Sequence, residues 1–391
     1  MITCEEALKV VRSKLSEVKT EIVNLVDSLG RVLAENIVAD MEMPPFDKSA
    51  MDGYACRYTD LHNDLTLIET IAAGNLPTKT VGPNQCSKIM TGAKVPAGAD
   101  CVFMVEHSEL KSDDIVIFTK DDTKSNICKQ GEDIQEGDIL INSGAYIKAA
   151  HIATMAAVGY AQVTVAVRPS VGVLVTGSEL VGAGEKPVDA QIRDSNGPQL
   201  CAQVTEAGGL VTFYGIIPDE RQATKDAIAQ ALAENDLLLV SGGSSMGDWD
   251  FVPELLVECG LENQFEKIAI KPGKPTVFAT SDTAACFGMP GNPVSTFVVF
   301  ENFVKAWITG SMGLVDSTLS LSLPLAKNIK CKDASRKSFI PVAIDEDGLV
   351  APVKFHGSAH INALTHADAL ASFPDGVTNL KSGDLIDARF I

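Results

Sequence analysis

The sequence predicts a multidomain α/β protein with a parallel sheet in its central domain, and three observations lead to this fold class. Apolar strands and helical patterns alternate from residue 170 to about residue 308, as they do in parallel sheets covered on both faces. The flanking regions instead hold short apolar runs separated by Gly and Pro, which is typical of β-rich modules. With 391 residues, the chain is also longer than an average single domain.

The N-terminal region is expected to form a helical linking domain from residues 1–40 and 141–168. Apolar spacing predicts a helix over residues 3–24, and Thr3 with Glu6 provides a capping box at its start. Within the same domain, residues 149–167 are the stretch most similar to a membrane span. Gly159 interrupts this stretch, so we expect a helix that stops near it and then a strand, with no membrane segment.

Two β-rich domains are predicted: an inserted domain over residues 41–140 and a C-terminal, barrel-like domain over residues 313–391. Alternating apolar residues bounded by turn residues indicate their strands. The expected strands are 65–71, 101–105 and 115–118 in the inserted domain, and 319–323, 339–344, 349–353 and 385–390 in the C-terminal domain.

The central domain is predicted over residues 169–312 as the parallel sheet. Ligands of such sheets bind outside the carboxyl ends of the strands. Gly-containing loops at these ends are therefore candidates: Thr176-Gly177, Ser241-Gly243 and Met289-Gly291. The expected strands are 171–175, 210–217, 236–240 and 286–288, and the expected helices are 195–207, 220–234 and 294 to about 308.

The second of these loops reads SGGSSMGDWD over residues 241–250. Its small residues let a ligand approach backbone amides, which bind anions. The carboxylates of Asp248 and Asp250 can hold a metal or move a proton. The alternative is an ordinary tight turn between a strand and a helix.

A second segment, KIAIKPGKP, gathers Lys267, Lys271 and Lys274. Its two prolines and its glycine restrict the backbone and allow a sharp bend. This arrangement favours binding of a small oxyanion, and the alternative is a basic turn exposed to solvent.

Two further segments are less specific. PPFDKSAMDGYA carries Asp47 and Asp52, which either project into a cleft or cap an ordered turn. In MPGNPVST, Pro293 suits the first turn of a helix and Asn292 its cap. Whether this helix start also binds a ligand does not follow from the loop itself.

Composition excludes some classes of function. The formal net charge of −19 opposes general nucleic-acid binding, because such a chain repels phosphates. The nine cysteines are scattered without a CxxC pair, which predicts reduced thiols and no zinc site. The N-terminus has no secretory apolar segment, so the expected location is cytoplasmic.

Taken together, seven motifs resemble those of molybdopterin molybdenumtransferases of the bacterial MoeA type, which are related to the E domain of gephyrin. Two C-terminal segments, Arg336–Pro341 and HGSAHINAL, are also similar to that family. The resemblance therefore covers nearly the whole chain. In chain order, the seven motifs are PPFDKSAMDGYA, KIMTGAKVPAGAD, VTGSEL, RDSN, SGGSSMGDWDF, KPGKP and MPGNPVS.

The resemblance implies a transferase of molybdenum cofactor biosynthesis that inserts molybdate into adenylylated molybdopterin, with release of AMP and with Mg²⁺ as cofactor. The central domain would then be the molybdopterin-binding domain. A homodimer is also implied, in which one subunit's α/β domain and the other subunit's N-terminal domains form the cleft. Other proteins of molybdenum cofactor biosynthesis are further expected partners.

The resemblance also assigns roles to residues. Asp52, Asp219, Asp250 and Glu179 are the expected catalytic residues, with Asp248 and Asp250 as metal ligands. Substrate-binding positions are Thr91, Thr176, Gly177, Ser195, Gly242, Gly243, Ser244, Ser245, Pro290, Gly291, Asn292 and Pro293. Molybdate-binding positions are Lys267, Lys271, Lys274, Pro275, Arg336 and Ser358, with Ser245 also suited to this ion.

Three positions depart from the family pattern. Lys48 stands where Asn is usual, Ser178 where Asp is usual, and His360 where Gly or Met is usual. Ser178 removes one carboxylate close to the implied metal.

Two alternatives remain open at this point. A molybdopterin adenylyltransferase of the same α/β fold would need only the central domain. A scaffold similar to gephyrin would bind partner proteins instead of catalysing a reaction.

Overall fold

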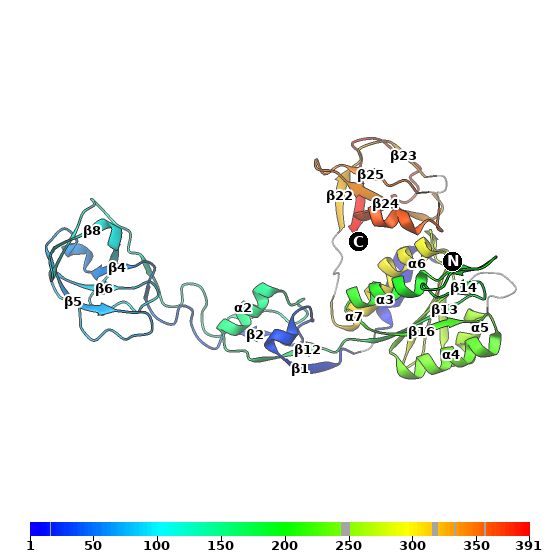
Figure 1. Cartoon of the computed structure of the whole chain (residues 1–391), viewed down its shortest axis with the longest axis horizontal. Helices are drawn as coiled ribbons and strands as arrows, with labels where there is room; N and C mark the ends of the chain where they lie inside the picture. Colours follow the sequence, from blue (N-terminus) through cyan, green and yellow to red (C-terminus); the bar gives the residue numbers. More distant parts are fainter. Residues whose placement is uncertain (16, 244–250, 315–319, 332–333, 356) are drawn as a thin grey trace. The chain divides into compact units, whose positions relative to one another are not determined.

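A computed structural model describes residues 1–15, 17–243, 251–314, 320–331, 334–355 and 357–391 (Figure 1). The chain divides into two compact units, and each is described by itself. The main unit comprises Met1–Ala34, Gly144–Lys148 and Val163–Ile391, and the inserted unit comprises Glu35–Ser143 and Ala149–Gln162.

The main unit is built on a six-stranded sheet of order β16-β13-β17-β21-β20-β18. The first four strands are parallel, as predicted, whereas β20 and β18 add an antiparallel edge that the sequence analysis missed. The predicted multidomain α/β fold is confirmed. The strands are β16 (Leu210–Ile217), β13 (Ser170–Thr176), β17 (Leu237–Ser241), β21 (Ala285–Met289), β20 (Val277–Thr280) and β18 (Glu262–Phe265).

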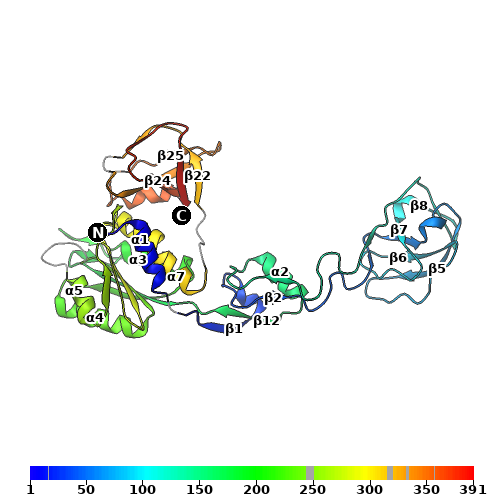
Figure 2. The same ribbon diagram turned by 180° about the vertical axis from the view of Figure 1, so that it is seen from behind.

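Helices cover both faces of this sheet because successive residues of β17 point to opposite sides. Leu237 and Leu239 join a core with α1, α3, α6 and α7, while Leu238 and Val240 join a second core with α4 and α5. Figures 1 and 2 show the two helical layers on opposite sides of the strands. The helices are α1 (Cys4–Ser13), α3 (Asn196–Glu206), α4 (Arg221–Glu234), α5 (Val252–Glu258), α6 (Pro293–Val299) and α7 (Lys305–Ser311), with a π-helical turn, η4 (Phe300–Val304), between α6 and α7.

The helix predicted over residues 3–24 is wrong beyond Ser13. Its capping box is present, since the Glu6 amide donates to Thr3 Oγ1 (3.1 Å) and the Thr3 amide donates to Glu6 Oε2 (2.8 Å). The chain then forms strand β1 (Thr20–Asn24), which pairs with β12 (Gln162–Ala166). β-Branched residues and strand pairing therefore override the apolar spacing in this segment.

The C-terminal part of the main unit is a β domain with its own apolar core. Its main sheet has the order β19-β24-β26-β28-β22, with β25 paired to β24. The strand β19 (Ile270–Lys271) comes from the segment before β20, so the two parts of the main unit share a sheet. The other strands are β22 (Ser320–Pro324), β23 (Ile329–Lys330), β24 (Lys337–Ile344), β25 (Val350–Pro352), β26 (Ala369–Ser372), β27 (Asn379–Leu380) and β28 (Leu385–Phe390).

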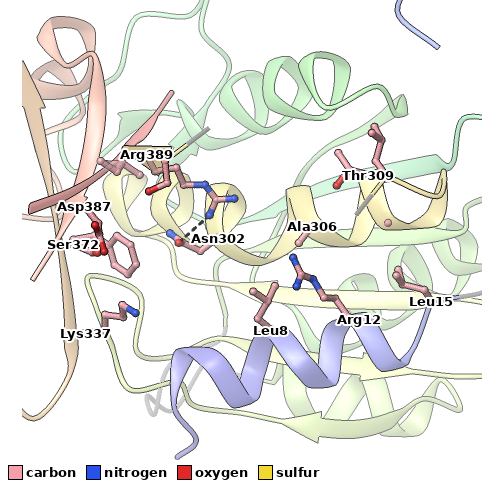
Figure 3. A pocket seen from close by; sticks show the side chains of 15 residues that line it. Leu8, Arg12, Leu15, Asn302, Ala306, Thr309, Lys337, Ser372, Asp387 and Arg389 are labelled. Carbon is pink, nitrogen blue, oxygen red and sulfur yellow. Dashed lines mark hydrogen bonds between the residues drawn. The ribbon is translucent and has the colours of Figure 1, made fainter. Parts of the chain in front are cut away.

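A cavity of about 460 Å³ lies between α1, α7 and this β domain (Figure 3). Arg12, Lys337 and Arg389 line it together with apolar side chains. Arg389 Nη1 donates to Asn302 Oδ1 (3.1 Å), which ties β28 to the π-helical turn. Lys337 Nζ forms a 2.6 Å ion pair with Glu5 of α1. Polar contacts therefore reinforce the contact between the β domain and the helices.

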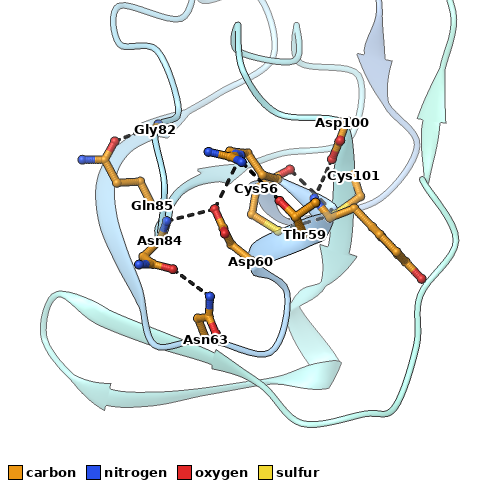
Figure 4. A network of polar contacts seen from close by, with 11 residues as sticks. Cys56, Thr59, Asp60, Asn63, Gly82, Asn84, Gln85, Asp100 and Cys101 are labelled. Carbon is orange, nitrogen blue, oxygen red and sulfur yellow. Dashed lines mark hydrogen bonds and ion pairs between the residues drawn. The ribbon is translucent and has the colours of Figure 1, made fainter.

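The inserted unit is mainly a six-stranded sheet of order β7-β4-β6-β5-β9-β8. Loops at one end of this sheet are held by polar contacts around Asp60, whose Oδ2 accepts from the Asn84 amide (3.0 Å) and pairs with Arg57 (3.6 Å) (Figure 4). Its elements include β3 (Lys48–Ser49), β4 (Gly53–Cys56), β5 (Leu65–Ile71), β6 (Gln85–Ile89), β7 (Cys101–Met104), β8 (Ser108–Ser112), β9 (Ile115–Phe118), β10 (Ile127–Cys128) and α2 (Ala149–Ala157).

The prediction for residues 149–167 is confirmed, because α2 ends at Ala157 and β12 follows. Among the described residues, none of the helices combines the length and the apolar character that crossing a bilayer requires.

Candidate functional site

Three loops at the carboxyl ends of the parallel strands line one cavity of about 610 Å³ in the main unit, here called the rim cavity. They follow β13, β17 and β21, as the sequence analysis predicted for ligand-binding loops. Glu179, Asp219 and Pro275 also line it. The predicted substrate-binding residues in its lining are Thr176, Gly177, Ser195, Gly242, Gly243, Pro290, Gly291, Asn292 and Pro293.

Gly242 brings two of these loops into direct contact. Its φ is +101°, a conformation that side-chain-bearing residues rarely adopt, and a Cβ here would lie 2.5 Å from the Thr176 carbonyl oxygen. The Gly242 amide also donates to the Met289 carbonyl (3.2 Å). Only glycine permits the two loops to come this close. Backbone groups of the three loops therefore surround the cavity.

Asn196, the first residue of α3, connects the loops from below the surface. Its Nδ2 donates to Ser241 Oγ and to the Gly291 carbonyl, both at 2.8 Å. Asn196 and Ser241 are both buried. RDSN is one of the motifs that resemble the family, but of its residues only Ser195 was predicted to bind the substrate. Asn196 was missed because the burial of its side-chain amide at the start of α3 cannot be read from the sequence.

Carboxylates are the main charged groups of the rim cavity: Glu179, Asp194 and Asp219. Asp219 is held by Ser178, whose amide donates to Asp219 Oδ2 (3.0 Å) and whose Oγ accepts from the Asp219 amide (3.2 Å). Asp194, which the sequence analysis missed, is buried and accepts from the Gly197 amide (3.0 Å).

The predicted metal ligands Asp248 and Asp250 lie outside the described residues, as do Ser244 and Ser245. Within the described ranges, no three His, Cys, Asp or Glu side chains are grouped to hold a metal ion.

The predicted molybdate-binding residues are only partly at the rim cavity. Pro275 lines it, and the Ser358 carbonyl accepts from the Val294 amide (2.9 Å) at the start of α6. Lys271 instead lies on β19, opposite Ser338 of β24. Lys267 and Lys274 bracket this strand, and Arg336 immediately precedes β24. None of the three lysines is in the cavity lining.

Asp52 and Thr91 lie together in the inserted unit. Asp52 Oδ1 accepts from the Thr91 amide (2.6 Å) and from Thr91 Oγ1 (2.7 Å). These two bonds hold the pKa of Asp52 below its ordinary value of 3.8, and the bond from the Thr91 backbone amide has the larger effect. Asp52 is therefore a carboxylate at neutral pH, fixed by its neighbour. Lys48, a departure from the family pattern, pairs with Cys128 on β10 of the same unit.

Three family models match successive parts of the chain. The MoeA N-terminal region (domain I and II) matches residues 2–159, a probable molybdopterin binding domain matches residues 172–309, and the MoeA C-terminal region (domain IV) matches residues 323–390. The probable molybdopterin binding domain contains the parallel strands and most of the residues that line the rim cavity.

Complete proteins with similar sequences and folds are also known. The molybdopterin molybdenumtransferase of Staphylococcus epidermidis is 34% identical over 99% of this chain and 94% of its own length. That of Bacillus subtilis is 33% identical over 100% of this chain and 94% of its own length. A crystal structure of a molybdopterin biosynthesis MoeA protein from Pyrococcus horikoshii matches with a TM-score of 0.86 and 29% identity over 100% of both chains. The chain therefore belongs to the molybdopterin molybdenumtransferase family.

Proposed function

We propose that this protein inserts molybdate into adenylylated molybdopterin and releases AMP. The observation that carries the proposal is the rim cavity, in which backbone groups from three loops surround a space large enough for a phosphorylated ligand. Amides in such strand-end loops bind phosphate. Full-length similarity to molybdopterin molybdenumtransferases supports this reaction over adenylylation, which would need only the central domain.

The proposed chemistry is cleavage of the phosphoanhydride by a positioned oxygen in line with the leaving AMP. We assign the loop amides to orienting the phosphates, and Glu179 and Asp219, which line the rim cavity, to orienting an attacking oxygen. The Ser178 amide donates to the Asp219 carboxylate and Ser178 Oγ accepts from the Asp219 backbone amide, so this carboxylate is held in place by its neighbour. The KPGKP lysines supply the fixed positive charges that desolvating a small dianion requires.

We also propose Mg²⁺ as the cofactor. The carboxylates of the rim cavity are oxygen donors of the kind that Mg²⁺ prefers, and we assign Asp248 and Asp250 as further ligands. Bound Mg²⁺ would neutralise charge on the anhydride oxygens. A Ser178→Asp variant restores the carboxylate usual in the family and should lower the Mg²⁺ concentration that gives half-maximal AMP release. An unchanged Mg²⁺ dependence would place the metal away from Ser178.

One experiment tests the main proposal. Purified protein is mixed with adenylylated molybdopterin, molybdate and Mg²⁺, and AMP and molybdenum cofactor are measured over a single turnover. We expect AMP release that depends on molybdate. If the protein instead consumes ATP to adenylylate molybdopterin, it is an adenylyltransferase.

We further propose that the protein is a homodimer. Apolar side chains that remain exposed around β1 support this, because Ile22, Val26 and Leu29 are 70%, 75% and 56% exposed. Mixing Asp52→Ala chains with Asp250→Ala chains should restore activity if the two residues come from different subunits. Mixed dimers that stay inactive, with both chains folded, would contradict a shared site.

A cytoplasmic location is proposed as well. None of the nine cysteines, all of which the structure describes, forms a disulfide, as is usual in a reducing compartment. Other proteins of molybdenum cofactor biosynthesis are the proposed partners, because the proposed reaction takes an adenylylated substrate that another enzyme must supply. Fractionation of cells that produce the protein with a C-terminal tag would test the location.

A further inference from the structure

Among the described residues that line the rim cavity, Arg193 is the one basic residue. Three carboxylates, Glu179, Asp194 and Asp219, line the same space. A phosphorylated ligand would meet repulsion from these acids unless a cation offset it. The KPGKP lysines are outside this lining, so they do not supply that cation at the cavity wall.

Arg193 is placed by a small, well-bonded ribbon at the edge of the cavity. It ends β15 (Ile192–Arg193), which pairs in parallel with β14 (Leu180–Val181). The ribbon is closed by bonds from the Ile192 amide to the Glu179 carbonyl and from the Asp194 amide to the Val181 carbonyl, both 2.9 Å. Arg193 therefore lies opposite Val181 of β14 and directly before Asp194, whose carboxylate lines the cavity.

The guanidinium of Arg193 is oriented by one hydrogen bond. Its Nε donates to the Glu185 carbonyl (2.7 Å), across the loop that joins the two strands of the ribbon. This bond uses only the Nε–H, so the donors on both Nη atoms are left for another acceptor. Across the described ranges, no protein acceptor bonds to either Nη atom. A planar pair of such donors matches two oxygens of a phosphate.

We propose that Arg193 binds a phosphate group of the nucleotide part of the substrate, which makes it a specificity-determining residue for phosphorylated ligands. This inference rests on the proposed function, because it takes an adenylylated compound as the ligand. It makes Arg193 the protein's own cation in the described lining of the rim cavity, in addition to the proposed Mg²⁺, and leaves the KPGKP lysines for the oxyanion.

The experiment compares AMP with adenosine, which lacks the phosphate, by isothermal titration calorimetry without molybdate or turnover. In Arg193→Gln, AMP should bind about tenfold to a hundredfold more weakly, as expected for loss of a charge-assisted contact, while adenosine binding stays unchanged. Arg193→Lys keeps the charge but loses the planar donors, so its AMP affinity should lie between those of the wild type and Arg193→Gln. Lys186→Gln is the matched control, because Lys186 is an exposed cation of the same loop outside the cavity lining.

Two results would overturn the inference. Equal weakening of AMP and adenosine in Arg193→Gln would show that Arg193 only supports the loop through Glu185. Wild-type protein that binds AMP no more tightly than adenosine would show that the cavity does not recognise the phosphate. Either result leaves the insertion reaction to be judged by the AMP-release assay, so the two proposals fail separately.

Discussion

The rim cavity of the main unit and the Asp52 loop of the inserted unit were both expected to hold active-site residues, but they are constructed differently. At the rim cavity, buried Asn196 and close backbone contact at Gly242 join loops that are far apart in sequence. Asp52 and Thr91 are exposed, and two bonds from one residue fix the carboxylate. A change at the rim cavity should therefore affect several loops, whereas a change at Asp52 should stay local.

The largest effect is expected from Gly242→Ala. The new Cβ would lie 2.5 Å from the Thr176 carbonyl oxygen, and φ of +101° would be strained. The loops after β13 and β17 must then separate, so we expect AMP affinity, measured by calorimetry, to fall by about a hundredfold or more.

Gly260→Ala is the control for backbone strain alone. Its φ is +89°, but a Cβ there meets nothing within 4 Å. We expect it to lower the free energy of unfolding by about 1–2 kcal/mol without changing AMP affinity. If Gly242→Ala behaved in the same way, close packing of the two loops would not define the cavity.

The KPGKP segment provides the next test, because its lysines are expected to act on molybdate and not on the nucleotide. Lys271→Ala and Lys274→Ala each remove a charge-assisted donor, worth roughly 1.5–3 kcal/mol. The molybdate concentration for half-maximal AMP release should rise about tenfold to a hundredfold, while AMP affinity stays the same. Reduced AMP affinity with unchanged molybdate dependence would assign the lysines to the nucleotide.

A smaller effect is expected from Asn196→Ala. The substitution removes the 2.8 Å donor to the buried Ser241 Oγ and to the carbonyl of the exposed Gly291. Leaving buried polar groups unsatisfied costs about 1–3 kcal/mol, which urea unfolding would measure. A change below about 0.5 kcal/mol, the usual range for surface substitutions, would show that water replaces the amide and that Asn196 does not connect the loops.

Helices and strands were predicted best where a single local pattern of apolar residues determined the element. Strands β16, β5, β9 and β28 have the predicted bounds, because continuous or alternating apolar residues are bounded by clear turns. The helix expected over residues 3–24 failed because β1 depends on pairing with β12, which lies more than a hundred residues away in sequence. Pairing partners at that distance leave no local pattern.

The same distinction applies to the candidate site. Gly242 and Pro293 were identified because local backbone demands select these residue types. Asn196 was missed because its importance comes from buried contacts with two loops that are distant in sequence, and Asp194 because its burial is not visible in the motif. The lysines were expected to bind a small oxyanion because three positive charges cluster on a restricted backbone. In the structure Lys271 lies on β19, in the β domain's sheet, and its role stays a prediction.

The smallest effect is expected in the inserted unit, from Thr91→Val. Valine has nearly the same shape but no hydroxyl, so Asp52 loses one of its two hydrogen bonds and keeps the one from the residue 91 amide. Because both bonds favour the carboxylate form, the pKa of Asp52 should rise towards 3.8 but stay below it. Carbon-detected NMR titration of the Asp52 carboxyl group would measure the shift.

The sign of the accompanying pH dependence follows from the direction of this shift. A carboxyl group whose pKa is lowered by folding stabilises the protein above its unfolded pKa, and this stabilisation is lost as the pH falls through the folded pKa. Thr91→Val should therefore reduce stability slightly at neutral pH and have no such effect once Asp52 is protonated in both states. An unchanged Asp52 pKa would show that the hydroxyl does not bond to the carboxylate in solution, and the local character of this loop would then rest on the backbone amide alone.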